Sequence, residues 1–430
     1  MRKIILFLSA IIISVSSFSQ NIPLKEQAVE AFKKEHYNEA IALLERAAKE
    51  TPDDAEIWYY LGWFTHYLSS DSRPLKGYDY VAHSQKIFNY LDEAIRLNPQ
   101  YGNALYFYGA ECQTVSEVYM LNNDLEKLKY YFKKAYDKGA YPAWLIEFGR
   151  NFLSSCEKDA ILFTGGDADL GVCMYLQLHE NYRTDVTIIP IGNVERPLWI
   201  KSLRDGLDGG IRKVNIDLTD FQIMDTRPYK WETTPIYIPV SQSLKNEFNL
   251  DKDFQFKWVV EPDLIEPGRV VTKIIEGEEA RARTYLSPRR AMLLQIIEDN
   301  FSERPIHFSN FAHPAFLAGL ESYFQNYGLT SRLVPIQTAN TEFSFNFTRI
   351  ENILTAENLK DFQSIKMLDM PRISGVVLYS YPFIFINLAN HYRLSGKDNE
   401  LKQLTELYRN HLKIGFNLEY EQMIISELEK

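Results

Sequence analysis

Small residues recur at a regular spacing along the first third of the chain, and this repeat limits the fold more than any other feature. Each lies where one helix must approach its neighbour closely, with large apolar residues on either side. These small residues are Ala40, Gly62, Ala94 and Gly109. Pro52 and Pro99 follow two of the segments and stop the helix from continuing. The pattern predicts a stack of helical hairpins.

The spacing of these positions is typical of tetratricopeptide repeats. Tyr37, Ala40 and Leu44 fit the second helix of one repeat, and "WYYLG" (58–62) fits the first helix of the next. We expect three such hairpins, with insertions around residues 69–83 and 116–123. A further first helix, "WLIEFGRNFL" (144–153), is expected to dock onto the domain that follows. Such arrays usually hold a protein or peptide in a groove, and simple packing against the next domain is the alternative.

The N-terminus has the pattern of an export signal. Arg2 and Lys3 precede an apolar run (4–15), and "SFS" (17–19) places small residues where cleavage before Gln20 requires them. The run is shorter than the roughly 20 apolar residues of a membrane span, and a retained anchor helix is the alternative. No cysteine follows the signal, which argues against a lipid anchor, and no later segment is expected to span a membrane. We expect a soluble periplasmic protein, with secretion as the alternative.

Charge and cysteine usage exclude several classes of function. A net charge of -10 argues against nucleic-acid binding, because phosphate binding needs a basic surface. Cys112, Cys156 and Cys173 form no CxxC pair, which argues against a disulfide framework or a zinc site. Cys112 falls at a small helix-packing position, and one disulfide among the three stays open. We expect no metal and no cofactor.

At Ala160 the helical spacing ends and strands alternate with a helix. An apolar strand (160–164) precedes Gly165-Gly166, a helix follows over 170–180, and "VTIIPI" (186–191) is a second strand. This order predicts parallel strands with a right-handed crossover, as in a Rossmann-like α/β domain. Further strands are predicted in "RPIHFSN" (304–310) and "RLVPI" (332–336), and loops with short strands over 216–275.

Two aspartates follow the first predicted strand, where open α/β sheets bind their ligands. Asp167 and Asp169 either bind a cation or sugar hydroxyls as a pair, or serve as a turn residue and a helix cap. The two glycines lack the spacing of GxGxxG and of a P-loop, so no phosphate cradle is predicted. The segment Arg183–Asp185 lies at the opposite edge of the sheet and is expected to be structural.

Other polar residues also follow predicted strands. Asn193, Glu195 and Arg196 come after the second strand, and they either join a site or form a solvated loop. His313 lies just beyond the strand at 304–310 and is the better histidine candidate, because a histidine within a strand, such as His307, is more often a core residue. The spacing suggests no Ser/His/Asp or Cys/His arrangement and contains no HExxH, so no catalytic residue or reaction class is assigned.

Two separated blocks resemble the soluble C-terminal region of multi-pass membrane proteins of the protein O-mannosyltransferase-like family. The first, "ILFTGGDADLGVCMYLQLHENYRTDVTIIPIGN" (161–193), resembles I-L-F-T-N-G-D-N-D-T followed by Y-L-Q and R-T-D-V. The second comprises "RPIHFS" (304–309) and "GLESYFQNYGLTSRLVP" (319–335). These resemble R-P-I-Y-F-A and G-L-x-x-Y-L-x-x-x-G-L-x-x-R-L-V-P. The similarity covers residues 156–335, and related proteins also carry helical repeats.

The departures from the family motif limit what the resemblance implies. Glycosyl transfer in that family is attributed to a membrane-embedded portion that we do not expect here, so no transferase residue is carried over. Three polar residues of the motif are replaced by Gly165, Ala168 and Leu170, and the tyrosine of the second block is His307. These replacements favour a structural or recognition role for the domain, while the retained pair of aspartates keeps a ligand site open.

The C-terminal region predicts one further helical hairpin. Phe385, Leu388 and Ala389 have the repeat spacing, after a linker with one helix over 340–372. The fold class is therefore α/β with all-α repeats. The expected domains are a signal peptide (1–19), a tetratricopeptide repeat domain (20–155), a Rossmann-like α/β domain (156–339), and a linker with a C-terminal hairpin (340–430).

The leading hypothesis is a non-enzymatic binding or scaffold protein that handles cell-envelope proteins or glycans. Its repeats would hold a protein or peptide partner, with a glycan as a second ligand class and no nucleic acid. The alternative is a sugar- or cation-dependent enzyme, or a glycan-binding module, that uses Asp167 and Asp169.

Overall fold

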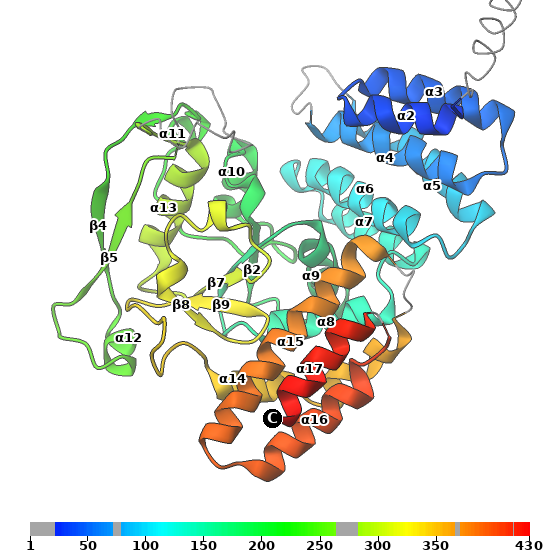
Figure 1. The fold of residues 1–430 in the computed structure, drawn as a ribbon. Coiled ribbons are helices and arrows are strands. Elements are labelled where there is room, and N and C mark those ends of the chain that lie inside the picture. Colours follow the sequence, from blue (N-terminus) through cyan, green and yellow to red (C-terminus); the bar gives the residue numbers. More distant parts are fainter. Residues whose placement is uncertain (1–21, 72–78, 264–282, 366–369, 416) are drawn as a thin grey trace, which may run out of the picture. The chain divides into compact units, whose positions relative to one another are not determined.

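The computed structural model describes residues 22–71, 79–263, 283–365, 370–415 and 417–430, so the predicted export signal lies outside the described residues. The chain is mostly helical and contains a five-stranded mixed sheet (Figure 1). It divides into two compact units, Met1–Phe107 and Tyr108–Lys430.

Helical hairpins form the first unit. Its helices are α2 (Leu24–Lys33), α3 (Tyr37–Glu50), α4 (Ala55–Asp71) and α5 (Tyr80–Leu97). Within this unit α2 packs on α3, α3 on α4, and α4 on α5. Gly62 of α4 explains the small-residue pattern, because a Cβ atom there would lie 2.5 Å from Cδ2 of Leu91 on α5. The buried alanines Ala40 and Ala94 are fully inaccessible to solvent, as close helix packing requires.

A third hairpin leads into the second unit. Its helices are α6 (Gly102–Leu121) and α7 (Leu125–Lys138), and α8 (Ala143–Ser154) follows. The insertion predicted around residues 116–123 falls at the end of α6, which continues to Leu121 with Val115 and Met120 buried along it. The helix predicted over 144–153 is confirmed as α8, and both α7 and α8 pack against α9 (Asp167–Glu180).

The sheet has the strand order β2-β1-β7-β9-β8. Its strands are β1 (Ile161–Thr164), β2 (Thr187–Pro190), β7 (Ile306–Ser309), β8 (Phe324–Asn326) and β9 (Thr330–Leu333). β1 pairs in parallel with both β2 and β7, so the predicted strand-helix-strand unit around α9 is confirmed. The strand expected at 332–336 begins at Thr330 and runs antiparallel to β7, which makes the sheet mixed. Among the described residues no disulfide forms, and Cys112, Cys156 and Cys173 are buried.

The remaining elements surround this sheet. They are η1 (Ile191–Asn193), α10 (Pro197–Asp205), α11 (Asp220–Met224), β3 (Tyr229–Lys230), β4 (Thr234–Pro239), α12 (Gln242–Glu247), β5 (Gln255–Val260), β6 (Tyr285–Leu286), α13 (Pro288–Asn300), η3 (Pro314–Phe316) and η4 (Glu321–Tyr323). β4 and β5 form an antiparallel pair at the side of the unit (Figure 1). Phe256, Trp258 and Val260 of β5 are buried and alternate with exposed residues, the pattern of a strand with one face on the core.

Helices complete the chain. They are α14 (Phe347–Ile353), the 3-10 helix η5 (Glu357–Ser364), α15 (Pro371–Leu394), α16 (Asp398–His411) and α17 (Leu418–Glu429). The linker thus holds η5 besides its one α-helix. The predicted single hairpin is incomplete, because α17 packs against both α15 and α16.

One described helix, Arg372–Leu394, is long and apolar enough to cross a membrane, with a mean hydropathy of 1.3. This corrects the expectation that no later segment would reach that length. The most apolar part of this helix is 56% buried inside the fold, where α14, α16 and α17 pack on it.

Candidate functional site

The turn after β1 places Asp169 at the carboxyl end of the sheet, and the fold itself uses both oxygens of this carboxylate. Oδ2 accepts the backbone N–H of Gly165 at 2.8 Å, and Oδ1 accepts that of Gly166 at 3.0 Å. Asp169 is 1% exposed. Its position in the first turn of α9 also suits the positive end of the helix dipole. The carboxylate therefore fixes the strand-to-helix turn, as the capping interpretation expects.

Two opposing effects act on the Asp169 carboxyl. Burial raises its pKa, and the hydrogen bonds from Gly165, Ser309 and Gly166 act in the opposite direction. The result is a raised pKa in a group closed off from solvent. Asp167 begins α9, but its side chain lies outside the described part of the structure.

Gly165 and Phe311 approach each other closely in the crevice between the loops that follow β1 and β7. The chain runs from β1 to β2 on one side and returns to β7 on the other, so this crevice is the topological switch point at which such sheets bind ligands. A Cβ on Gly165 would meet the backbone carbon and oxygen of Phe311 at 3.0 Å. The Phe311 ring packs near Phe148 and Phe152 of α8, with centroids 6.0 and 6.4 Å away. At this point the two loops leave little room for a side chain on residue 165.

The polar residues after β2 form ion pairs with other elements. Asn193 Nδ2 donates to Glu117 Oε1 at 3.2 Å, and the Arg196 guanidinium lies 2.6 Å from Glu117 Oε2. Glu195 pairs with Arg289 of α13 at 2.6 Å. The structure therefore brings Asn193 and Arg196 to one carboxylate on α6 and holds Glu195 at a separate pair.

The two histidines occupy different surroundings. His313 is exposed, and its Nδ1 accepts the N–H of Ala315 at the start of η3. His307 is fully buried in β7, where Nδ1 lies 3.0 Å from the Thr330 hydroxyl and Nε2 lies 3.5 Å from Glu157. Burial lowers the pKa of His307 despite that carboxylate. His307 is a core histidine with partners, as its place in a strand suggests.

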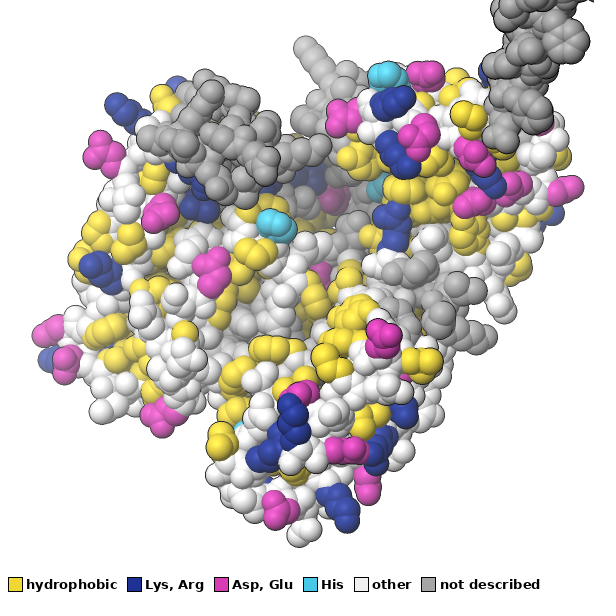
Figure 2. Space-filling view, in the orientation of Figure 1, with side chains coloured by type: hydrophobic (Ala, Val, Ile, Leu, Met, Phe, Trp, Pro, Cys, Tyr) yellow, Lys and Arg dark blue, Asp and Glu magenta, His cyan; other side chains and the backbone are white. Residues whose placement is uncertain are grey.

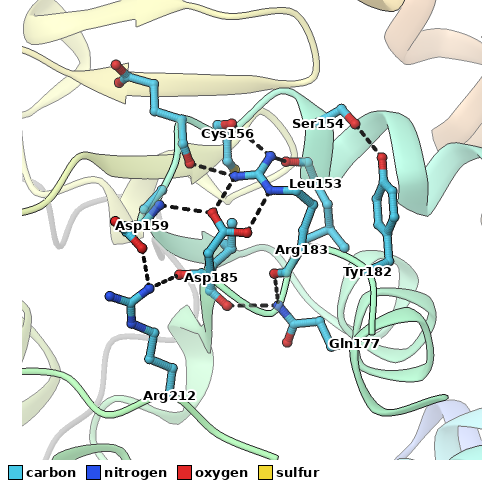
Figure 3. A network of polar contacts seen from close by, with 12 residues as sticks. Leu153, Ser154, Cys156, Asp159, Gln177, Tyr182, Arg183, Asp185 and Arg212 are labelled. Carbon is cyan, nitrogen blue, oxygen red and sulfur yellow. Dashed lines mark hydrogen bonds and ion pairs between the residues drawn. The ribbon is translucent and has the colours of Figure 1, made fainter. Parts of the chain in front are cut away.

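Arg183 holds the opposite edge of the sheet (Figure 3). Its guanidinium forms a two-pronged pair with Asp185, at 2.9 Å for each prong. The same group donates to the carbonyl oxygens of Leu153, Cys156 and Glu157 at 2.7–3.0 Å. All its donors point into the fold, which accounts for the structural role expected of this segment.

Gln177 completes this network from α9. Its side-chain amide donates to the carbonyl oxygens of Arg183 and Val186, each at 2.8 Å (Figure 3). The pair Arg183–Asp185 lowers the pKa of Asp185 to about 2. These contacts join α8, α9 and the start of β2.

Residues 145–209 and 259–353 match the family model TMEM260-associated domain 2. TMEM260 is an O-mannosyltransferase-like protein, so the match supports the link that the two sequence blocks predict. The matched residues, here called the TMEM260-associated segment, contain all five strands of the sheet. The hairpins α2–α7 and the helices α15–α17 lie outside it. No curated protein and no solved structure matches the chain.

Several residues that carry the resemblance have internal partners within the TMEM260-associated segment. Asp169 fixes a turn, Gln177 and Arg183 bind backbone carbonyls, and Asp185 pairs with Arg183. These contacts stabilise the fold. Thr164 of the same block is buried, and its hydroxyl oxygen has no hydrogen-bond partner.

An open groove of about 780 Å³ lies beyond the end of β7 in the TMEM260-associated segment and reaches α15. Its lining combines aromatic rings with polar groups and one carboxylate, Glu321; it includes Ser309, Asn310, Ser331, Thr338, Ser344, Tyr379 and Phe383. Asn310 and Ser331 hydrogen-bond to each other at 2.7 Å, and Phe383 is 52% exposed. Hydrophobic side chains gather over α15 on the face drawn in Figure 2. The groove suits a ligand that stacks on aromatic rings and hydrogen-bonds.

Sequence reasoning missed a second cavity, of about 720 Å³, between α7, α8, α9 and η5. It contains Glu147 of α8 and Asp361 of η5, which are 214 positions apart. The available signal was an acidic residue between Leu145 and Phe148 on an otherwise apolar helix. Nothing in the spacing indicates that η5 would supply its neighbour.

Proposed function

We propose that the chain is an exported binding or scaffold protein of the cell envelope. In this proposal the helical hairpins are a tetratricopeptide-like array that holds a protein partner. The Rossmann-like domain is a non-catalytic module that stabilises the array and contributes a binding surface. The protein acts in the periplasm after its signal is removed, or outside the cell.

The outer face of α7 is the observation that carries the proposal. Tyr130 and Tyr136 are 58% and 41% exposed, and lysines alternate with them along the helix. Lys133 Nζ lies 5.9 Å from the centre of the Tyr136 ring, a cation–π distance. Exposed aromatic residues are enriched in protein interfaces. A basic aromatic face on a chain of net charge -10 suits a partner with acidic and apolar groups.

The contacts of the turn after β1 support the non-catalytic part of the proposal. Gly165 touches the Phe311 backbone, and Asp169 has both oxygens occupied by N–H donors. The link to TMEM260 supports a role near exported proteins or glycans, because TMEM260 is an O-mannosyltransferase-like protein.

Site-specific photo-crosslinking in the cell envelope tests the partner surface. A photo-reactive residue at Tyr130 should give a discrete crosslinked species. The same residue at Tyr237, which is 53% exposed on β4, is the matched control. Equal crosslinking at both positions, or none at Tyr130, would refute the assignment to α7.

A glycan-binding module is the second candidate, favoured by the groove beyond β7. Its aromatic and hydroxyl lining resembles the chemistry of sugar recognition more closely than the Asp167–Asp169 turn does. A thermal-shift screen with neutral sugars tests it, since a ligand at 100 times its Kd adds about 2.7 kcal/mol. The shift should disappear in Phe383→Ala and persist in Asp169→Asn. If the shift disappeared in Asp169→Asn but persisted in Phe383→Ala, the sugar would bind at the turn after β1 and not in the groove.

A further inference from the structure

The second cavity has a negatively charged lining. Its acidic residues are Asp137, Glu147, Glu180, Glu357 and Asp361, and its basic residues are Arg150 and Lys360. Both basic residues already have acidic partners, because Arg150 pairs with Glu180 and Lys360 pairs with Glu357. Asp137 pairs with Lys133 of its own helix. The remaining two carboxyl groups, Glu147 and Asp361, therefore determine what the cavity attracts.

Glu147 is buried at this cavity with one oxygen unsatisfied. Its side chain is 5% exposed. Oε2 accepts the backbone N–H of Asp361 at 3.0 Å, whereas Oε1 has no hydrogen-bond partner. A buried carboxylate oxygen without a donor costs free energy, and a ligand that supplies a donor would recover it.

The groups packed around Glu147 do not supply that donor. Burial raises its pKa to about 7, and the neighbouring Asp361 carboxylate adds to this rise, while Lys360 opposes it weakly. On α15, the Tyr381 hydroxyl accepts from Asn151 Nδ2 at 3.0 Å and is itself fully buried. Near neutral pH, protonation of Glu147 therefore removes one of the two negative charges of the carboxyl pair in place of a cation.

We propose that this cavity binds a primary ammonium group, with Glu147 and Asp361 as its two carboxylate partners. An ammonium group carries three donors and one positive charge, so it can satisfy Glu147 Oε1 and offset one of the two negative charges of the pair at once. Tyr136 lines the same cavity and offers an aromatic wall to the alkyl chain that bears the amine. The lysine side chain of a peptide and a free alkyl diamine share this chemistry.

Several observations favour an amine over other ligands. A volume of about 720 Å³ is far larger than a metal ion needs and lies within the range of small-ligand sites. Among the described residues no group of three or more metal-ligating side chains is present. A neutral sugar would leave the excess negative charge of the lining uncompensated. The cavity shares Tyr136 with the α7 partner surface and has no lining residue in common with the groove beyond β7.

Isothermal titration of the purified chain at pH 6 and pH 8 in 150 mM salt tests the proposal. The ligands are 1,5-diaminopentane, N-acetyl-lysine methylamide and its uncharged counterpart N-acetyl-norleucine methylamide. We expect an amine to bind, and the norleucine compound not to. Binding should be about ninefold tighter at pH 8, since the ionised fraction of a group with a pKa of about 7 rises from about one tenth to nine tenths. Titration in two buffers of different ionisation enthalpy should show proton release.

Variants separate the carboxyl pair from the general negative charge. Glu147→Gln and Asp361→Asn should each weaken amine binding at least tenfold, and Glu147→Gln should also remove its pH dependence because it removes the group that titrates. Glu357→Gln removes one rim charge and should change affinity less than threefold. A thermal melt confirms that each variant is folded.

The outcomes are distinct. Binding of the lysine compound alone supports the proposal and identifies a peptide lysine, and binding of the diamine alone supports it and identifies a small amine. No binding of either at millimolar concentration, equal binding of the norleucine compound, or binding of calcium chloride instead would overturn it.

Discussion

The buried carboxyl of Glu147 should make the stability of the chain depend on pH, and replacing it with an amide should remove this dependence. In Glu147→Gln the amide oxygen can accept the N–H of Asp361 as Glu147 Oε2 does now. The amide nitrogen can donate to the Asp361 carboxylate. The variant therefore keeps the existing contact and loses the ionisable group.

The direction of the effect follows from the raised pKa. Below pH 4.5 the carboxyl is protonated in both the folded and the unfolded chain, so the two proteins should be equally stable. Between pH 4.5 and about 7 the unfolded chain ionises first, which lowers the free energy of unfolding of the parent. Above pH 7 the loss is complete. A pKa that rises from 4.5 to about 7 corresponds to at most about 3 kcal/mol, and local relaxation reduces this to about 1–2 kcal/mol.

Urea unfolding at pH 5 and pH 8 measures this difference. The free energies of unfolding of Glu147→Gln and the parent should converge as the pH falls below 4.5, so their difference at pH 5 should be small, and at pH 8 the variant should exceed the parent by about 1–2 kcal/mol, with a melting temperature higher by a few degrees. Glu357→Gln, whose side chain is 78% exposed on η5, should show no such change. A difference that is independent of pH, or a variant less stable than the parent at pH 8, would falsify the reasoning.

Three further predictions test the structural interpretation of the strand-end motif by chemical denaturation. Gly165→Ala should lower the free energy of unfolding by about 1–3 kcal/mol, because its Cβ would meet the neighbouring backbone at 3.0 Å. Gly166→Ala is the control: a Cβ there would have nothing within 4 Å, so its free energy of unfolding should stay within about 0.5 kcal/mol of the parent. Equal effects of the two substitutions would argue for an open crevice. Asp169→Asn should lose about 1–3 kcal/mol without any ligand, since an amide cannot accept both N–H groups; an unchanged stability would reopen the ligand interpretation. Arg183→Lys should lose about 2–3 kcal/mol through its five inward contacts, and Arg150→Lys less than about 1 kcal/mol; similar losses would contradict the assigned role of Arg183.

Local patterns predict much of this fold. The small residues of the hairpins and the apolar strands around α9 act through near neighbours, so their spacing suffices to place α2–α8 and to pair β1 with β2. The spacing does not indicate that the residues expected as an insertion continue α6, in which Val115 and Met120 are buried. The helix α17 lacked a periodic signal of its own, and its position depends on the surface that α15 and α16 present.

The candidate site was harder to predict, because a carboxylate after a strand has two physical uses. Sequence places Asp169 at the sheet edge, and only coordinates show whether its oxygens face backbone N–H groups or open space. The same limit applies to Glu195 and Arg196, whose partners Arg289 and Glu117 are distant in sequence. The sequence spacing can identify which residue types lie at the edge of the sheet. Ion pairs and hydrogen bonds with distant elements decide which of these side chains remain available to a ligand.

This competition explains why the cavity at Glu147 lies away from the switch point. A ligand at Asp169 would have to displace two charge-assisted hydrogen bonds of 2.8 and 3.0 Å and separate Gly165 from the Phe311 backbone. At Glu147 a ligand displaces only a proton and satisfies an oxygen that has no donor. Ligand binding at Asp169 would break contacts that hold the sheet to α9, whereas ligand binding at Glu147 would add a hydrogen bond. The packing of the helices against the sheet, rather than the sheet edge, therefore offers this chain its more favourable place to bind a ligand.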